Sequence, residues 1–147
     1  MISQTAEYAL RAVVFLGTQD GRPLTTRAIA AKTQVPAGYL SKVLQGLGRA
    51  DLVQSHRGLG GGFVLARALD EITVLDVINA VDPLRRIKHC PLGLVAHGTR
   101  LCPLHRRLDE AIAQAESLFE GTTIAQLLEE TTAGRSEAVP TCPGHRA

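Results

Sequence analysis

The first third of the chain alternates apolar positions at helical spacing with short polar breaks. In residues 3–17 the apolar side chains recur every three or four positions, which predicts a helix that ends at the polar turn over residues 18–23. Residues 24–35 begin with threonines that can cap a helix and continue with small apolar side chains, which predicts a short second helix. Pro36 follows, and proline suits the start of a new helix because its missing N–H would be unpaired there anyway. The order of helix, short helix, tight turn and helix is typical of a helix-turn-helix.

The third helix is followed by a pattern that fits a β-hairpin. Residues 52–67 read LVQSHRGLGGGFVLAR: a short apolar run, four glycines within five positions, and a second apolar run. Glycine adopts positive φ angles without steric cost and therefore permits a tight reversal between two strands. A hairpin directly after a helix-turn-helix is a wing.

Helical spacing returns in the second half of the chain. Residues 69–82 predict a helix capped by Thr73, and residues 83–105 predict a loop because proline and glycine interrupt them. Residues 103–130 carry an apolar stripe with a period close to 3.6, which predicts one long helix. Such a helix needs a partner to cover its stripe, and two paired helices in a homodimer are the simplest source. Residues 131–147 have little apolar content and are predicted to form a mobile tail.

These patterns together predict a mainly α fold. A winged helix-turn-helix domain with a two-stranded wing is expected over residues 1–82, and a loop of cysteines and histidines over residues 83–105. A dimerisation helix region is expected over residues 106–130, before the tail.

Composition agrees with a small helical protein. The chain of 147 residues is long enough to bury a core, and 45% of its residues are hydrophobic. Aromatic residues make up only 3% and tryptophan is absent, so the core must consist of Leu, Val, Ile and Ala, a mixture that favours helices. Glu7 and Arg11 precede any long apolar run, so we expect neither a signal peptide nor a membrane span, and a cytoplasmic location.

The charge distribution is more informative than the formal net charge of +2. Residues 21–68 hold seven Lys or Arg and the single acid Asp51, whereas residues 109–130 hold six acids and no basic residue. A basic region beside an acidic one is typical of a polyanion-binding module followed by a second functional region. The alternative is two ordinary solvated faces of opposite sign.

The sequence shows no catalytic constellation. The glycines of residues 58–62 lack the Lys-Ser/Thr pair that follows the glycines of a phosphate-binding loop, and strands are predicted on both sides of them. There is also no Ser-His-Asp spacing, and no pair of carboxylates in a predicted cleft. An enzyme is therefore not expected.

The loop before the long helix concentrates metal-binding residue types. Residues 88–107 read KHCPLGLVAHGTRLCPLHRR and contain two of the three cysteines of the chain. An odd and small number of cysteines argues against a disulfide framework and favours thiols that act as ligands or redox groups. The tail repeats the CPxH pattern at Cys142, although a mobile tail is poorly suited to provide a fixed third thiol.

On these residues the chain resembles the Rrf-type (IscR/NsrR-like) winged helix-turn-helix transcription regulators. The resemblance spans about residues 1–130. It is carried by EYALRAVVFL, by VPAGYLSKVLQGLGRADLVQSHRGLGGGFVLAR and by the cysteines before the long helix. It implies a homodimer that binds double-stranded DNA at a palindromic operator, with one recognition helix in the major groove of each half-site.

The resemblance also implies a set of DNA contacts. Lys42 and Arg57 are the strongest candidates for phosphate contacts or guanine readout. Relatives carry Ser and Glu where this chain has Gly38 and Ser41, so its operator is expected to differ. Tyr39 and its neighbour Leu40 lie at a spacing that also fits the core. The full candidate set is Thr26, Gly38, Tyr39, Ser41, Lys42, Gln45, His56, Arg57 and Gly60.

An iron-sulfur cluster is implied by the same resemblance. In cluster-bearing members the loop follows C-x5-C-x5-C, some with a histidine three positions later, and this pattern falls on Cys90, Ala96, Cys102 and His105. Because Ala96 replaces the middle cysteine, a 2Fe-2S cluster is favoured over a 4Fe-4S cluster. The implied ligands are Cys90, Cys102, His105 and Glu7 of the partner subunit, with His97 as an alternative to His105.

The residues leave other interpretations open. Two thiolates and two imidazoles also suit zinc, and either cysteine can act as an oxidisable thiol. A regulator of the same fold without a cluster, which senses a thiol, a metal or a small molecule, is a further alternative. A small redox or metal-carrier protein with a degenerate DNA-binding domain is disfavoured by the basic region and by the intact glycine wing.

Overall fold

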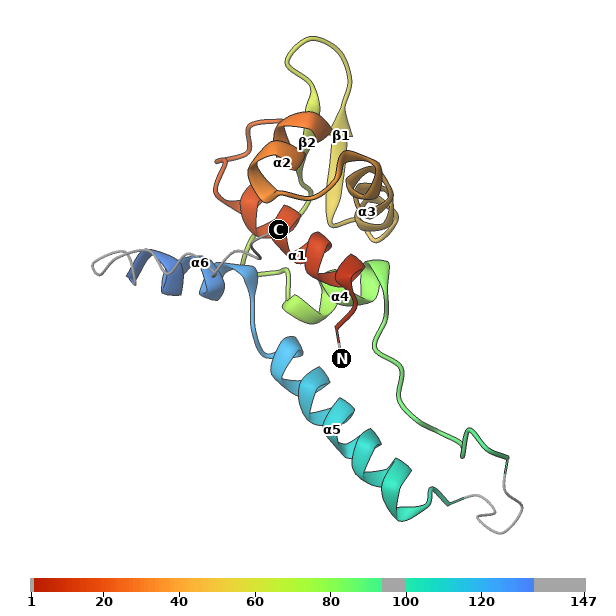
Figure 1. Ribbon diagram of the computed structural model, residues 1–147. Helices are drawn as coiled ribbons and strands as arrows, with labels where there is room; N and C mark the ends of the chain where they lie inside the picture. Colours follow the sequence, from red (N-terminus) through yellow and green to blue (C-terminus); the bar gives the residue numbers. More distant parts are fainter. Residues whose placement is uncertain (1, 94–99, 134–147) are drawn as a thin grey trace.

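The computed structural model describes residues 2–93 and 100–133, and within these ranges the chain is mostly helical with one two-stranded sheet (Figure 1). The mainly α class and the winged arrangement predicted from the sequence are confirmed. The elements in chain order are α1 (Gln4–Gly17), α2 (Thr26–Thr33), α3 (Ala37–Arg49), β1 (Val53–His56), β2 (Gly62–Leu65), α4 (Val74–Val81), α5 (Pro103–Glu120) and α6 (Ile124–Ala133).

Local sequence chemistry fixes the ends of the helix-turn-helix. The Thr25 hydroxyl caps α2 by accepting a hydrogen bond from the Ala28 N–H at 3.1 Å. Gln34 ends α2 in the left-handed region with φ of 58°, and Pro36 is the N-cap of α3. The tight turn between α2 and α3 follows from these two residues.

The core is built around α1. Ala6, Ala9 and Ala12 are each fully buried, and their small side chains allow neighbouring helices to approach the α1 backbone closely. The remaining core consists of branched aliphatic side chains, as the composition predicted. The buried set includes Val13, Leu16, Ile29, Val35, Leu40, Val43, Leu44, Leu47, Leu52, Val53, Ile72, Val77 and Ile124.

The wing is an antiparallel hairpin attached to the chain before α2. Strand β1 pairs with β2 in a register that runs from Val53 opposite Leu65 to His56 opposite Gly62. Leu24 extends this ladder, because the Phe63 N–H donates to the Leu24 oxygen at 2.7 Å and the Leu24 N–H donates back at 3.1 Å. Gly62 has φ of 147°, and a Cβ there would clash with the Leu24 backbone. Only glycine therefore allows this attachment.

The prediction of a single helix over residues 103–130 is wrong. The segment forms two helices, and residues 121–123 separate them. The chain leaves α5 because Ile124 is fully buried in the core, and because its N–H donates to the Ile72 oxygen at 2.9 Å. Burial of Ile124 therefore outweighs continuation of the helix, and α6 packs on the domain predicted over residues 1–82.

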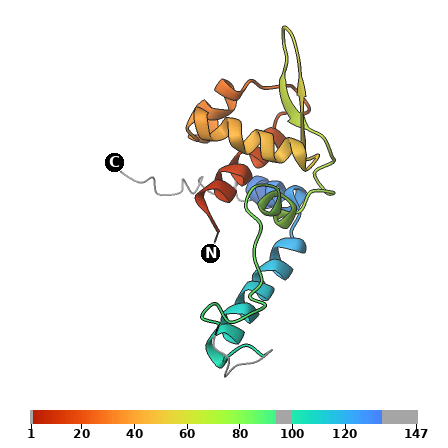
Figure 2. The ribbon, with the colours of Figure 1, turned by 90° about the vertical axis from the view of Figure 1, so that its right-hand side faces the viewer.

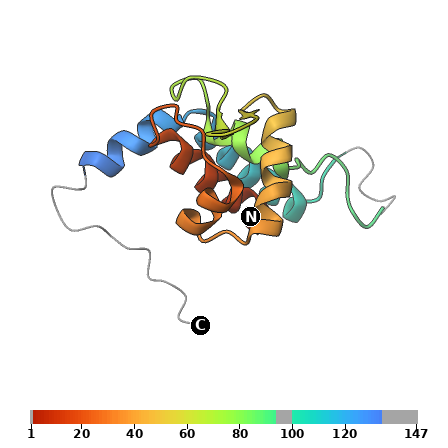
Figure 3. The ribbon, with the colours of Figure 1, turned by 90° about the horizontal axis from the view of Figure 1, so that it is seen from above.

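Helix α5 forms an arm that extends away from this body (Figures 1 and 2). Its carboxyl end is held by Phe119, which packs against Ala6, Val74 and Ile78. The chain that follows α4 leaves the body on one side and leads towards the start of α5, as the view from above shows (Figure 3). The far end of the arm therefore carries Cys102, the second cysteine of the candidate metal-binding loop.

Two sequence expectations concern the ends of the chain. The predicted tail spans residues 131–147. Residues 131–133 form the end of α6 instead, and residues 134–147 lie outside the described residues. Among the helices of the described ranges, none has the length and apolar character needed to cross a membrane.

Candidate functional site

One face of α3 is free of the core and carries most of the predicted DNA contacts. Gly38, Ser41, Lys42 and Gln45 are all exposed, whereas the buried side chains of α3 occupy the opposite face. The Ser41 hydroxyl donates to the Ala37 oxygen at 3.2 Å, so it also partners the helix backbone. The period of α3 therefore separates a packing face from a polar face suited to contact a groove.

Tyr39 and Leu40 differ in their surroundings although they are adjacent. Leu40 is fully buried, as its spacing predicted, but Tyr39 is 57% exposed, so a core position for Tyr39 is wrong. The Tyr39 ring meets the Tyr8 ring of α1 edge to face, with centroids 6.2 Å apart and planes at 63°. Tyr39 thus connects the first turn of the candidate recognition helix to α1.

The remaining DNA-contact candidates lie on the wing and at the start of α2. His56, Arg57 and Gly60 are exposed, and Gly60 has φ of 73° in the turn of the hairpin. Thr26 is the first residue of α2 and is half-buried. No acidic residue occurs in the sequence from 52 to 69, so the wing offers only neutral and positive side chains to a polyanion.

A polar network on α1 leads from Glu7 towards α3. Arg11 forms an ion pair with Glu7 and donates a long hydrogen bond of 3.5 Å to the Thr33 oxygen at the end of α2. The Arg11 guanidinium also lies 5.8 Å from the centre of the Tyr8 ring, which contacts the Tyr39 ring edge to face. Sequence reasoning missed this network, although the i,i+4 spacing of Glu7 and Arg11 indicates the ion pair.

Cys102 and His105 are the candidate metal ligands that the fold brings together. Cys102 is the N-cap of α5, and its Sγ accepts a hydrogen bond from the His105 N–H at 3.5 Å. The Sγ atom lies 3.1 Å from Nδ1 of the His105 ring, and both residues are half-buried. The first turn of α5 therefore holds a thiol and an imidazole side by side.

Of the other candidate ligands, Cys90 and Glu7 are not assembled with this pair. Cys90 is half-buried in a turn where the Gly93 N–H donates to its oxygen at 3.0 Å, and His97 lies outside the described residues, as do Ala96 and Cys142. Glu7 is exposed on α1, away from the end of the arm (Figures 1 and 2). Across residues 2–93 and 100–133, no three His, Cys, Asp or Glu side chains form a group that could hold a metal ion.

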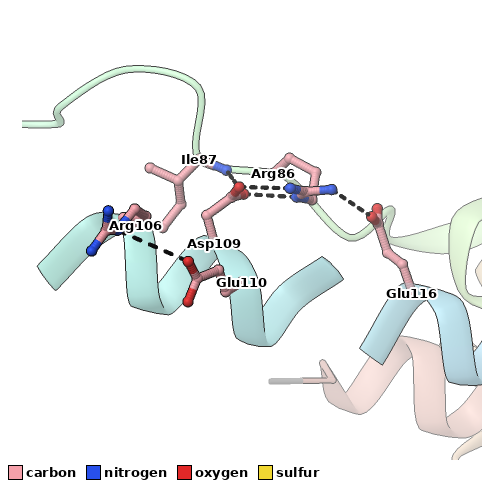
Figure 4. A network of polar contacts seen from close by, with 6 residues as sticks. All are labelled: Arg86, Ile87, Arg106, Asp109, Glu110 and Glu116. Atoms are coloured by element: carbon pink, nitrogen blue, oxygen red, sulfur yellow. Dashed lines mark hydrogen bonds and ion pairs between the residues drawn. The ribbon is translucent and has the colours of Figure 1, made fainter. Parts of the chain in front are cut away.

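A clamp between Arg86 and Asp109 ties the chain before Cys90 to α5 (Figure 4). The Arg86 guanidinium donates two hydrogen bonds to the Asp109 carboxylate, at 2.7 and 2.6 Å, and the Ile87 N–H donates a third at 2.8 Å. A second carboxylate, that of Glu116, lies 3.5 Å from Arg86. Sequence reasoning missed the clamp, because 23 residues separate Arg86 from Asp109 and no local pattern marks such a pair.

The clamp shifts the pKa values of both partners. The hydrogen bonds from Arg86 lower the pKa of Asp109 from its ordinary 3.8 to about 2, against the opposing effect of partial burial. The same contact raises the pKa of Arg86 above its ordinary value. The clamp is therefore fully charged at neutral pH.

Comparison with known proteins identifies relatives over most of the chain. Residues 2–130 match Rrf2, a family described as iron-dependent transcriptional regulators. The regulator NsrR of Geobacillus kaustophilus is 31% identical over 141 residues, 92% of this chain and 94% of its own.

Two solved structures share the fold. CymR, the global cysteine regulator of B. subtilis, matches with a TM-score of 0.72 and 25% identity, over 89% of this chain and 98% of its own. The IscR of T. potens matches with a TM-score of 0.74 and 22% identity, over 95% of this chain and 92% of its own.

The pKa of Asp109 yields a prediction about acid stability. A lowered pKa in the folded state means that the clamp stabilises the fold above pH 3.8, and that this contribution disappears as the pH falls through about 2. We expect the Asp109 carboxyl to titrate near 2 by NMR. In the wild type we expect the free energy of unfolding to fall as the pH is lowered from 3.8 to about 2, and we expect a smaller fall over this range in Asp109→Asn. Glu129→Gln, which removes an exposed carboxylate of α6 outside the clamp, is the control. Titration of Asp109 at its ordinary value, with the same acid dependence in Asp109→Asn, would contradict the clamp.

Proposed function

This chain belongs to the Rrf2 family of transcriptional regulators, and we propose that it is a repressor that binds a palindromic operator as a homodimer in the cytoplasm. The observation that carries the proposal is the exposed polar face of α3 beside a basic wing that is fixed to the rest of the domain. The family consists of regulators and not of enzymes.

The two parts of this surface have different tasks in the proposal. Helix α3 fits the major groove, where Lys42 and Gln45 reach base edges or phosphates. The wing lies beside it and places Arg57 on the neighbouring backbone or minor groove. Two such surfaces related by two-fold symmetry read the two halves of a palindrome.

Salt dependence of binding tests the DNA contacts. An operator is first selected from a random duplex library with the wild-type protein, and its affinity is measured by fluorescence anisotropy over a series of salt concentrations. If Lys42 contacts one phosphate, Lys42→Ala weakens binding and lowers the salt slope by about 0.9 per contact. Lys88→Ala, which removes an exposed lysine from the chain before Cys90, is the matched control and leaves both quantities unchanged. Selection of no duplex at all would refute the regulator proposal, and an unchanged slope in Lys42→Ala would refute this contact.

The arm provides the argument for the dimer. Within the described chain none of the 18 residues of α5 is buried, and Leu104, Leu108 and Leu118 are 63%, 47% and 66% exposed. A groove of about 500 Å³ lies beside the helix, and apolar side chains such as Ile78, Ile112 and Leu108 line it. A helix with an uncovered apolar stripe is marginal in water, so a second copy that covers it stabilises both.

The charges of α5 indicate how two arms meet. Arg106 and Arg107 lie near its start, where both form ion pairs with Glu110, and Glu116 and Glu120 lie towards its end, where Glu116 is 3.5 Å from Arg86. Bases at the start of a helix and acids at its end oppose the helix dipole. In an antiparallel pair the arginines of one helix lie opposite Glu120 of the other, whereas a parallel pair places like charges together, so the charges favour the antiparallel orientation.

Sedimentation tests the dimer. The variant Leu104→Asp/Leu108→Asp places two charges in the apolar stripe, and we expect it to sediment near the monomer mass of 15.7 kDa. The wild type should sediment at twice that mass, and the variant should bind a full palindrome weakly. Leu59→Asp alters an exposed leucine of the wing, outside α5, and serves as the control for the sedimenting mass. A monomeric wild type, or a variant that stays dimeric, would contradict this interface.

We propose further that the arm holds a 2Fe-2S cluster, with redox state, nitric oxide or iron as the signal. The proposed ligands are Cys90, Cys102, His105 and Glu7 of the partner subunit, with His97 as a substitute. The donor types fit, because two thiolates, an imidazole and a carboxylate are ligands that iron accepts. The side-by-side Cys102 and His105, and the description of the family as iron-dependent, support iron. Zinc is the alternative for the same donors.

The network on α1 offers a route from the cluster to DNA. When a Glu7 carboxylate serves the partner's cluster, its ion pair with Arg11 weakens. The Arg11 guanidinium can then move relative to the Tyr8 ring and the Thr33 oxygen, and the Tyr8 ring contacts the Tyr39 ring edge to face. Cluster loading and the position of α3 are therefore linked through three contacts, each of which can favour one arrangement of α3 over another.

Anaerobic purification tests the cluster and its coupling. We expect a brown protein with about two irons and two sulfides per site, and Cys102→Ala to lose both colour and iron. We expect Tyr8→Leu to keep the cluster but to reduce the ratio of operator affinities between loaded and cluster-free protein. A colourless wild type after reconstitution with iron and sulfide would refute the cluster, and would favour zinc, a reactive thiol or a small-molecule signal on the same DNA-binding fold.

A further inference from the structure

Leu59 at the tip of the wing is the most exposed large apolar side chain in the described part of the protein. Its relative exposure is 108%, against 74% for Leu92, the next highest. The exposed leucines of α5 lie on the apolar stripe that is proposed to form the dimer interface, and the Tyr39 ring contacts the Tyr8 ring edge to face. Leu59 is in neither group, and an isolated leucine held fully in water contributes nothing to the stability of the fold.

The turn that carries Leu59 has a backbone conformation that requires glycine. Gly58 and Gly60 on either side have φ of 94° and 73°, which side chains with a Cβ rarely adopt. The Gly61 N–H donates to the Gly58 oxygen at 3.0 Å, and a Cβ at Gly61 would clash with the His56 oxygen. The turn therefore places Leu59 at the apex of the hairpin, between glycines that leave its side chain exposed.

The charge and position of the tip point to nucleic acid. The wing extends beyond α2 and α3 in both side views (Figures 1 and 2), so its tip reaches past the body of the domain. Arg57 lies two residues before Leu59 and is exposed, and no acid occurs from residue 52 to residue 69. An apolar tip next to a cation and without nearby acids suits a groove whose walls are sugar rings between phosphates.

We propose that Leu59 is an apolar wedge that enters the minor groove flanking each half-site and favours a pyrimidine–purine step there. An apolar side chain in the minor groove contacts the deoxyribose walls and partly opens a base step. Opening is least costly at TA and CA/TG steps, so the wedge selects these steps through their deformability and not through hydrogen bonds. The inference rests on the proposed operator binding and adds a specificity determinant outside the recognition helix.

Selection from a library with constant half-sites and randomised flanks tests the wedge. We expect the wild type to enrich pyrimidine–purine steps at one flanking position. Leu59→Ala and Leu59→Gln should bind the enriched operator on the order of tenfold more weakly and lose the flank preference, while the half-site preference is unchanged. A 2-aminopurine placed at that step should brighten with the wild type and not with the variants. Leu92→Ala is the control, and unchanged thermal unfolding of Leu59→Ala excludes misfolding, because an exposed side chain contributes little to stability.

The outcomes separate the wedge from the proposed function. If Leu59→Ala binds all flanks as the wild type does, the wedge is refuted while operator binding stands; a leucine that docks another protein would give this result. If the wild type selects no duplex at all, both the wedge and the regulator proposal fail.

Discussion

Close packing around α1 is the constraint on which the rest of the structure depends. Its buried alanines allow α2, α3, α4 and α6 to contact one helix, so each of these elements is positioned by the same backbone. The outer face of α1 carries Glu7, Arg11 and Tyr8. A displacement of α1 at Glu7 therefore also affects α3, because the two helices are packed together.

The molecule separates its two candidate sites along its length. The DNA-binding surface of α3 and the wing is on the body, whereas Cys102 and His105 lie at the far end of α5 (Figure 1). Glu7 in the same chain is remote from this pair, but a two-fold partner can bring its own arm to the body of the first chain. In the proposed dimer the metal site and the interface are thus the same region. A change at the metal can therefore alter the distance between the two recognition helices.

Both sites are held by interactions that limit their movement. Glycines and the Leu24 bridge fix the wing, and the Arg86–Asp109 clamp fixes the start of the cysteine loop to the helix that Cys102 caps. Rigid support of this kind reduces the entropy lost when DNA or a metal binds. It also defines discrete arrangements between which a regulator can switch.

The sequence by itself determined the helix-turn-helix, the hairpin wing, the caps at Thr25 and Thr73, and the identity of the candidate ligands, because these depend on local propensity and on periodicity. The break at residues 121–123 could not be predicted from the sequence, because the apolar period continues through it. The helix is interrupted only because Ile124 is buried in the core. The contacts of Tyr39 with Tyr8 and of Arg86 with Asp109 likewise join residues far apart in the chain, and no local pattern encodes them. Tertiary structure alone decided which helices end early, which polar groups pair and which apolar side chains are left for a partner, since each depends on the packing of all elements at once.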